Sequence, residues 1–195
     1  MQQTSINYLM QTEINNALKI LKQGGIILYP TDTIWGIGCD ATNFDAIEKI
    51  YKLKQRNESK SLICLVSDLK MLNYYIQDIP ETAYDILKYV DKPTTIIYDE
   101  PVRISKNLIA NDNTLAIRIV SDGFCNLLIK RLQKPIVSTS ANISGKSTPK
   151  SFKEISKEVL KGVDYVVNLP DVKKAVKPSS IIKLTTDGKV KVIRK

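Results

Sequence analysis

Segments with the apolar pattern of strands alternate with segments of helical periodicity along most of this 195-residue chain. In 12–23 the apolar residues recur at spacings of three and four, which is typical of a helix, and two glycines follow. The next run, 26–30, is apolar and stops at a proline, as a buried strand would. Strands and helices that alternate in this way predict an α/β fold, and we expect a single domain over 1–195.

The remaining elements are predicted from the same patterns. Further helices are expected at 43–55, 68–76, 81–90, 123–133 and 151–160, and further strands at 61–67, 94–100, 114–120, 164–170, 179–185 and 189–195. A strand that starts at 135 should run into a polar loop, and 31–42 has the composition of a loop. Because the last strands follow one another without helices, we expect a mixed sheet rather than a purely parallel one.

Two helix starts carry capping signals. Asn43 is a suitable N-cap for the helix over 43–55. Ser151 and Glu154 have the spacing of a capping box at the start of 151–160.

The charged composition narrows the chemistry that the chain can perform. The formal net charge is +9, and there is no histidine, which excludes the histidine-based catalytic triads and most zinc sites. A basic balance favours polyanionic partners such as nucleotides or RNA, although a generally basic proteome would also produce it. Cys39, Cys64 and Cys125 are too far apart for a metal motif, so we expect buried thiols.

Nothing in the sequence indicates a membrane protein. No run approaches the roughly 20 apolar residues of a membrane helix. The N-terminal stretch MQQTSINYLM lacks the basic-then-apolar layout of a signal peptide, so a cytoplasmic location is expected.

Two glycine-containing stretches are similar to nucleotide-binding motifs. GIGCDA, 36–41, fits G-x-G-x-x-A, but five residues separate it from the preceding strand, so a turn that needs positive φ is the simpler interpretation. SANISGKS, 140–147, is one residue short of a P-loop, and Pro149 stands where the phosphate-binding helix should begin. Because this loop follows a strand end, it could bind a phosphate or nucleotide, or be an ordinary turn.

Polar residues at other strand and helix ends are further candidates. Thr31 and Thr33 could hydrogen-bond a small polar ligand, or they could close the strand as an ST-turn. Lys54, Arg56 and Lys60 could hold phosphates, although a solvated helix end is the alternative. From residue 173 onward, eight lysines and arginines accompany one acid, which could be an RNA-facing segment or a basic edge of the sheet.

Taken together, these segments resemble the YrdC-like family, the threonylcarbamoyl-AMP synthases. PTDTIWGIGCDA is similar to the family's PTxTxYGLGxDA, KLKQR contains its K-x-R, and STSANISG contains the S-x-N of its SANxSG. TLAIRIV resembles the segment with its substrate-binding arginine, KPSSIIKL its PSTVVDL, and KVIRK its closing xLRxG. The order and spacing agree over nearly the whole chain.

The resemblance implies a fold and an activity. The fold would be a twisted mixed sheet flanked by helices around a basic cavity, in the short form of one domain. The activity would be the conversion of L-threonine, bicarbonate and ATP to threonylcarbamoyl-AMP and pyrophosphate. A partner transferase would then modify an adenosine of tRNA. The tRNA would contact this chain either directly or only through that partner. Mg²⁺ would arrive with ATP, and no protein metal ligand is expected.

The resemblance also implies roles for individual residues. The ATP-binding residues would be Lys54, Arg56, Lys60, Ser140, Asn142 and Arg194, with Lys54 and Arg56 also catalytic. The threonine-binding residues would be Thr31, Thr33, Arg118 and Ser179. Asp32 would be either a general base or a cap of its loop. The chain departs from the family pattern at Asn57, Ser61 and Leu65.

Other classes of function remain open on the sequence. A non-catalytic RNA-binding module is the main alternative, because the net charge suits phosphate contacts. A related carbamoyl-adenylate step in a larger enzyme and a dinucleotide oxidoreductase have less support. The first lacks the accompanying zinc-finger cysteines, and the second rests on one glycine motif.

Overall fold

One mixed sheet organises the chain. The structure is a computed structural model that describes residues 2–55, 62–120, 123–169 and 178–195. Within these ranges nine strands pair in the order β7-β1-β2-β6-β3-β5-β4-β8-β9. The strands are β1 (Ile27–Pro30), β2 (Trp35–Gly38), β3 (Ile63–Val66), β4 (Thr94–Asp99), β5 (Thr114–Ile119), β6 (Ile136–Ser140), β7 (Tyr165–Val166), β8 (Ser180–Leu184) and β9 (Val190–Arg194).

The pairing of the strands confirms a mixed sheet. The pairs β1–β7, β3–β5 and β4–β8 are parallel, and the other neighbours are antiparallel. Antiparallel pairs can be joined by short turns, whereas parallel pairs need longer crossover connections. The prediction that the domain extends over all of 1–195 stays a prediction.

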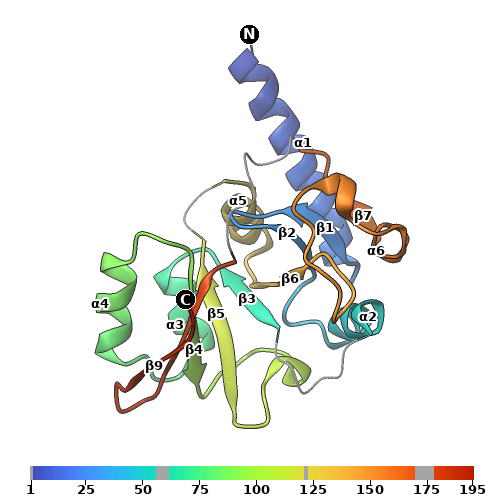
Figure 1. Ribbon diagram of the computed structural model, residues 1–195. Coiled ribbons are helices and arrows are strands. Elements are labelled where there is room, and N and C mark those ends of the chain that lie inside the picture. The colour runs from blue at the N-terminus through green and yellow to red at the C-terminus, as the bar shows by residue number, and fades with distance from the viewer. Residues whose placement is uncertain (1, 56–61, 121–122, 170–177) are drawn as a thin grey trace.

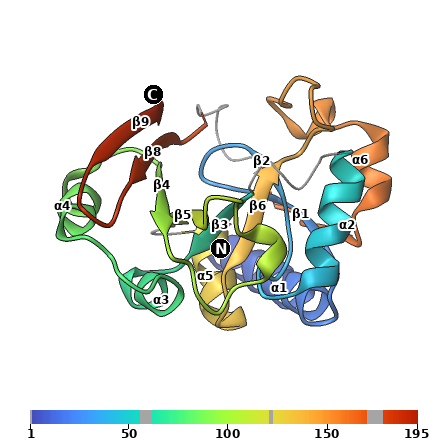
Figure 2. The same cartoon turned by 90° about the horizontal axis from the view of Figure 1, so that it is seen from below.

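Helices cover the sheet (Figure 1). They are α1 (Gln2–Lys22), α2 (Phe44–Lys54), α3 (Leu69–Tyr75), α4 (Glu81–Tyr89), α5 (Gly123–Leu132) and α6 (Lys157–Gly162), with short 3₁₀ turns η1 (Lys106–Leu108) and η2 (Phe152–Glu154). Figure 2 shows α1 and α5 below the sheet, with the β1–β2 turn and the β8–β9 hairpin on its upper side.

Two buried clusters hold these layers together. One joins α1 and α5 to the sheet through Ile14, Leu21, Tyr29, Leu65, Leu128 and Ile129. The other packs α2, α3, α4 and α6 against the sheet through Ile47, Ile50, Leu72, Ala83, Ile117 and Val159. The apolar spacing predicted along 12–23 is therefore the buried stripe of α1, which begins ten residues earlier than expected.

The three cysteines are buried thiols, as predicted. Burial raises the pKa of the Cys64 thiol to about 12 and holds that of Cys39 well above its usual value. Within the described part of the chain, no helix is both long enough and apolar enough to cross a bilayer.

The expected helix over 151–160 is divided into two short pieces. Asn43 caps α2 as predicted, because its Oδ1 accepts a hydrogen bond of 3.0 Å from the Ala46 amide. Ser151, in contrast, makes no capping bond; the Glu154 carboxylate instead accepts from the Lys150 amide and closes the turn η2. Ile155 then takes an extended backbone and enters the core, so α6 starts afresh behind Ser156.

The prediction of a loop over 31–42 was wrong, because this segment contains β2. Its glycines do not have positive φ, so the interpretation as a turn was also wrong. They are needed where strands approach closely: a Cβ on Gly38 would lie 2.3 Å from the Val137 carbonyl oxygen and 2.8 Å from the Tyr29 ring. The glycines therefore allow β2 to fit between β1 and β6.

We predict that Gly38→Ala lowers the free energy of unfolding by about 2–4 kcal/mol, because a backbone carbonyl cannot move aside for the new methyl group. Gly36→Ala should cost clearly less, since its Cβ would meet side-chain atoms at 3.2 Å. Urea unfolding of both variants measures the difference. Equal losses for the two variants would contradict the close-approach explanation.

Candidate active site

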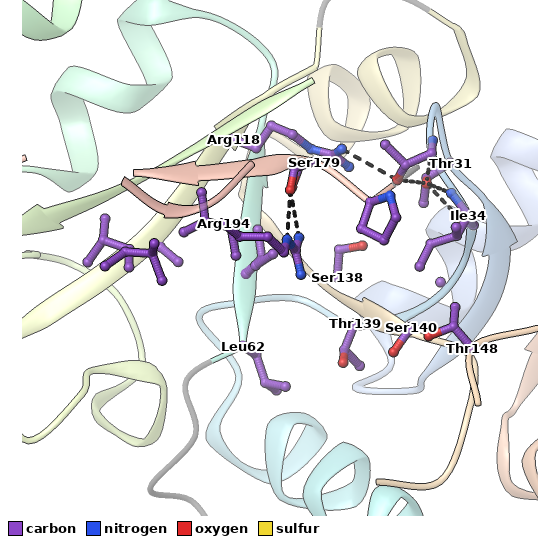
Figure 3. Close-up of a pocket in the computed structure, with 18 residues that line it drawn as sticks. Thr31, Ile34, Leu62, Arg118, Ser138, Thr139, Ser140, Thr148, Ser179 and Arg194 are labelled. Atoms are coloured by element: carbon purple, nitrogen blue, oxygen red, sulfur yellow. Dashed lines mark hydrogen bonds between the residues drawn. The ribbon is translucent and has the colours of Figure 1, made fainter. Parts of the chain in front are cut away.

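A cavity of about 330 Å³ is lined by residues of the β1–β2 turn and of the sheet (Figure 3). It receives residues from seven consecutive strands of the sheet, β2, β6, β3, β5, β4, β8 and β9. Seven strands in a flat sheet would be roughly 29 Å wide, so the sheet must curve around a cavity of this size. The polar lining residues are Thr31, Thr33, Arg118, Ser138, Thr139, Ser140, Thr148, Ser179 and Arg194.

The turn between β1 and β2 forms one wall. The Thr31 hydroxyl donates to the Ile34 carbonyl at 2.7 Å and accepts from the amides of Thr33 and Ile34, both at 3.1 Å. Thr31 therefore closes the strand as an ST-turn, one of the two alternatives that the sequence left open. The Thr31 hydroxyl also lies 3.0 Å from the Thr33 hydroxyl, and the Thr33 hydroxyl is in turn contacted by Arg118.

A buried arginine on β5 faces this turn. Arg118 is only 5% exposed, and its Nη2 forms an ion pair of 3.0 Å with Asp32 Oδ1. Its Nη1 lies 3.5 Å from the Thr33 hydroxyl, which makes a long hydrogen bond. Its Nε is buried and has no hydrogen-bond partner among the described residues. A buried donor without a partner is costly, so the guanidinium group, which lines the cavity, can still take a further acceptor.

A second arginine closes the opposite side. Arg194 on β9 donates from Nε and Nη2 to the Ser179 carbonyl, at 3.0 and 2.7 Å. The Ser179 hydroxyl is 2.8 Å from that of Thr95, which is fully buried. Burial, and secondarily the positive charge of Arg118, lowers the pKa of Arg194. The two cations therefore repel each other across the cavity, and an anion between them would relieve that repulsion.

The cavity wall carries no compensating negative charge in the described part of the chain. Its lining contains two guanidinium groups and no carboxylate, because Asp32 lies on the other side of Arg118. Hydroxyl groups on β6 and on Thr148 complete the polar surface. The arrangement suits a ligand with more than one anionic group.

Lys54 holds the loop that follows β6. It is 2% exposed at the end of α2, and its Nζ donates to the carbonyls of Ser140 and Asn142 at 2.6 and 2.7 Å. The Lys54 carbonyl in turn accepts from the Ser144 amide at 2.9 Å. These contacts fix the loop from behind, and Lys54 is not part of the described cavity lining.

The structure places the predicted site residues in two groups. Thr31, Thr33, Arg118, Ser140, Ser179 and Arg194 come together around the cavity. Lys54 and Asn142 lie behind it: the Asn142 side-chain amide donates to the Lys146 carbonyl at 2.6 Å, and its Oδ1 is buried without a hydrogen-bond partner among the described residues. Arg56 and Lys60 fall outside the described residues. The assigned ligand roles stay predictions.

Several lining residues were not predicted. Ser138, Thr139 and Thr148 add hydroxyls, and Thr95 orients Ser179 from inside the sheet. The alternation of strand β6 could have indicated Ser138, because Ser138 and Ser140 are two residues apart on one face. Thr95 carries no comparable signal, since its role comes from pairing with a residue 84 positions away.

Neither glycine-containing motif has the geometry of a nucleotide fingerprint. GIGCDA begins within β2, which is antiparallel to β1, instead of forming a turn between a strand and a helix. SANISGKS leads into a turn and into η2, so no phosphate-binding helix starts there. The described residues contain no group of three or more cysteine and acidic side chains that could hold a metal ion.

The fold and cavity define a class, an α/β protein whose curved sheet encloses a site lined by hydroxyls and arginines. A model of the Sua5/YciO/YrdC family, described as "Telomere recombination", matches residues 19–195. The chain belongs to this family.

Similar proteins come from archaea and bacteria. A Methanocaldococcus jannaschii protein is 37% identical over 186 residues, which are 92% of this chain and 86% of that protein. The threonylcarbamoyl-AMP synthase of Pseudoalteromonas translucida is 33% identical over 163 residues, 82% of this chain and 87% of the relative. The structure of P. abyssi Sua5 complexed with L-threonine is similar with a TM-score of 0.80 at 25% identity. That likeness covers 88% of this chain, which spans half of the Sua5 chain.

We predict that Lys54→Met lowers the free energy of unfolding by about 2–4 kcal/mol, because two partly buried carbonyls lose a charged, buried donor. Hydrogen exchange at the Ser144 amide should also become faster. Lys52→Met, two residues earlier on the exposed face of α2, is the matched control and should change stability by less than about 0.5 kcal/mol. A Lys54 variant as stable as the Lys52 variant would contradict the role of Lys54 in holding the loop.

Proposed function

We propose that the chain is an L-threonylcarbamoyladenylate synthase, which converts L-threonine, bicarbonate and ATP to threonylcarbamoyl-AMP, pyrophosphate and water. The observation that carries this proposal is the pair of arginines on a hydroxyl-lined cavity, in a chain of the Sua5/YciO/YrdC family. The name of the P. translucida relative and the threonine complex of P. abyssi Sua5 support the same activity.

Threonine would bind at the Arg118 side of the cavity. The unpartnered Nε of Arg118 is a suitable donor to the amino-acid carboxylate. The Thr33 hydroxyl lies beside the same guanidinium, and the Ser179 hydroxyl lies across the cavity. Thr31 would contribute mainly by shaping the turn, since its hydroxyl already makes hydrogen bonds within it.

ATP would occupy the side formed by the β6 loop and β9. Ser140 lies on the wall, and Arg194 would bind phosphate oxygens or the carbamate. Lys54 and Asn142 hold the loop, and Arg56 and Lys60 are proposed as further phosphate ligands. Mg²⁺ would enter as a complex with ATP, because the described lining offers no carboxylate to hold it.

The reaction can then proceed mainly through alignment of substrates. The threonine amine and bicarbonate form a carbamate and lose water. A carbamate oxygen attacks the α-phosphorus of ATP, the bond to the bridging oxygen breaks, and pyrophosphate leaves. The protein's contribution is to hold the reactants in line and to stabilise negative charge with guanidinium groups.

The product would be used in tRNA modification. We propose that a partner transferase passes the threonylcarbamoyl group to an adenosine of tRNA, and that both proteins act in the cytoplasm. Exposed lysines near the β6 loop suit contact with tRNA itself; they are Lys146, Lys150, Lys153, Lys157 and Lys161. The same lysines favour the second candidate function, a non-catalytic RNA-binding module.

Release of pyrophosphate from ATP distinguishes these two functions. We expect release that requires both L-threonine and bicarbonate. Omission of either substrate should reduce it to the level without protein, because a carbamate is needed to attack ATP. Absence of release, together with tight and salt-sensitive RNA binding, would overturn the synthase proposal in favour of the RNA-binding module.

Arg118→Ala should raise the KM for L-threonine by about 100-fold or more, since one charge-assisted contact to a carboxylate is lost in a buried site. The KM for ATP should change much less. Arg103→Ala is the control, because the Arg103 guanidinium stacks 4.7 Å from the Tyr74 ring and lies outside the cavity lining. Steady-state pyrophosphate assays at varied threonine test this, and an unchanged KM would contradict the assignment of Arg118.

A further inference from the structure

Consecutive residues of the β1–β2 turn face two different cavities. Thr31 and Thr33 line the cavity described above, whereas Asp32, between them, lines a second cavity of about 720 Å³. The walls of this second cavity come from α3, α4 and the segment 90–94. The sequence Thr-Asp-Thr of this turn therefore divides its side chains between the two cavities.

The ion pair between Arg118 and Asp32 connects the two cavities. Arg118 is 5% exposed, whereas the Asp32 side chain is 32% exposed, so the cation carries most of the cost of burial. A buried charge without a partner destabilises a protein strongly. Asp32 therefore compensates Arg118 from the side opposite to the substrate cavity, and leaves that cavity without a carboxylate in the described lining.

The contacts of Arg118 also fix the plane of its guanidinium group. Nη2 is bound to Asp32 at 3.0 Å and Nη1 contacts Thr33 at 3.5 Å, so the far end of the group is held at two points. Nε is left without a hydrogen-bond partner in the described part of the chain. Asp32 thus holds the far end of the guanidinium group, leaves Nε unused and does not itself line the first cavity.

We propose that Asp32 is a positioning residue, which orients Arg118 to bind the carboxylate of the amino-acid substrate. This inference rests on the proposed function, because it assigns threonine to Arg118. It also distinguishes Asp32 from a general base: its Oδ1 is engaged by a guanidinium, and the residue lines the second cavity instead of the first.

The test is Asp32→Asn, which keeps the shape of the side chain and removes its charge. We expect the KM for L-threonine to rise by about 10- to 100-fold, because the Arg118 guanidinium loses its orientation. The kcat and the KM for ATP should change by less than about threefold, because no other contact to the substrates is lost. Asp91→Asn is the matched control. Asp91 lines the same second cavity, but it forms no ion pair with Arg118 in the described structure, so its KM should not change.

A binding measurement separates positioning from a general structural effect. Calorimetry with L-threonine and with L-threoninamide, which lacks the carboxylate, gives the preference of each variant for the carboxylate. Asp32→Asn should reduce that preference by the same factor by which it raises the KM. If Asp32→Asn does not fold, Asp32→Glu keeps the charge but displaces it, and should reduce the preference by a smaller factor.

Each other outcome overturns the inference. A fall in kcat with an unchanged KM, accompanied by loss of the acidic limb of the pH profile, would make Asp32 a general base. Equal preference for the carboxylate in wild type and in both Asp32 variants would show that Arg118 does not depend on Asp32. If the wild-type chain binds neither threonine nor threoninamide, the proposed function fails and this inference fails with it.

Discussion

The structure of the site depends on the burial of one positive charge, the Arg118 guanidinium. A strand at the centre of a sheet normally carries apolar side chains, and an arginine there requires a partner. Asp32, which lies in the β1–β2 turn, is this partner. The Thr31 hydroxyl holds the turn through its hydrogen bond to the Ile34 carbonyl. The need to pair the Arg118 guanidinium therefore fixes the position of Asp32 and of its neighbours Thr31 and Thr33, which lie on the cavity wall.

A second buried cation, Lys54, stabilises the loop that follows β6. Lys54 ends α2 and binds two carbonyls of the loop after β6, so that a helix packed on the sheet fixes the loop beside the cavity. Arg118 lines the cavity, whereas the Lys54 ammonium donates to backbone carbonyls. The basic residues thus have different functions in the structure, although they look alike in the sequence.

The amino-acid pattern predicted most of the architecture. Apolar periodicity located the helices and strands, and the absence of helices between the last strands indicated a mixed sheet. It failed where a residue's role is set by a distant neighbour. The sequence predicts a turn at Gly36 and Gly38. Glycine is needed there instead because β1 and β6 lie close to β2, and local sequence does not show this closeness. The helix expected over 151–160 is interrupted at Ile155 because this side chain packs in the core, and local sequence does not indicate that packing.

The same limit applies to the site. The family motifs predicted Thr33, Arg118, Ser179 and Arg194 as site residues. The fold brings these residues to one cavity from β2, β5, β8 and β9 or the segments before them. The ion pair of Asp32 with Arg118 and the hydrogen bond of Thr95 with Ser179 join residues 86 and 84 positions apart, respectively. Contacts at such separations follow from strand order, which periodicity alone does not provide.

The most direct test of this account is a crystal structure of the chain with L-threonine and a non-hydrolysable ATP analogue. The account predicts the threonine carboxylate within about 3 Å of Arg118 Nε, with the Arg118–Asp32 ion pair intact and the nucleotide phosphates toward Arg194. A carboxylate bound away from Arg118, or an Asp32 side chain that leaves Arg118 to contact the threonine amine, would contradict it.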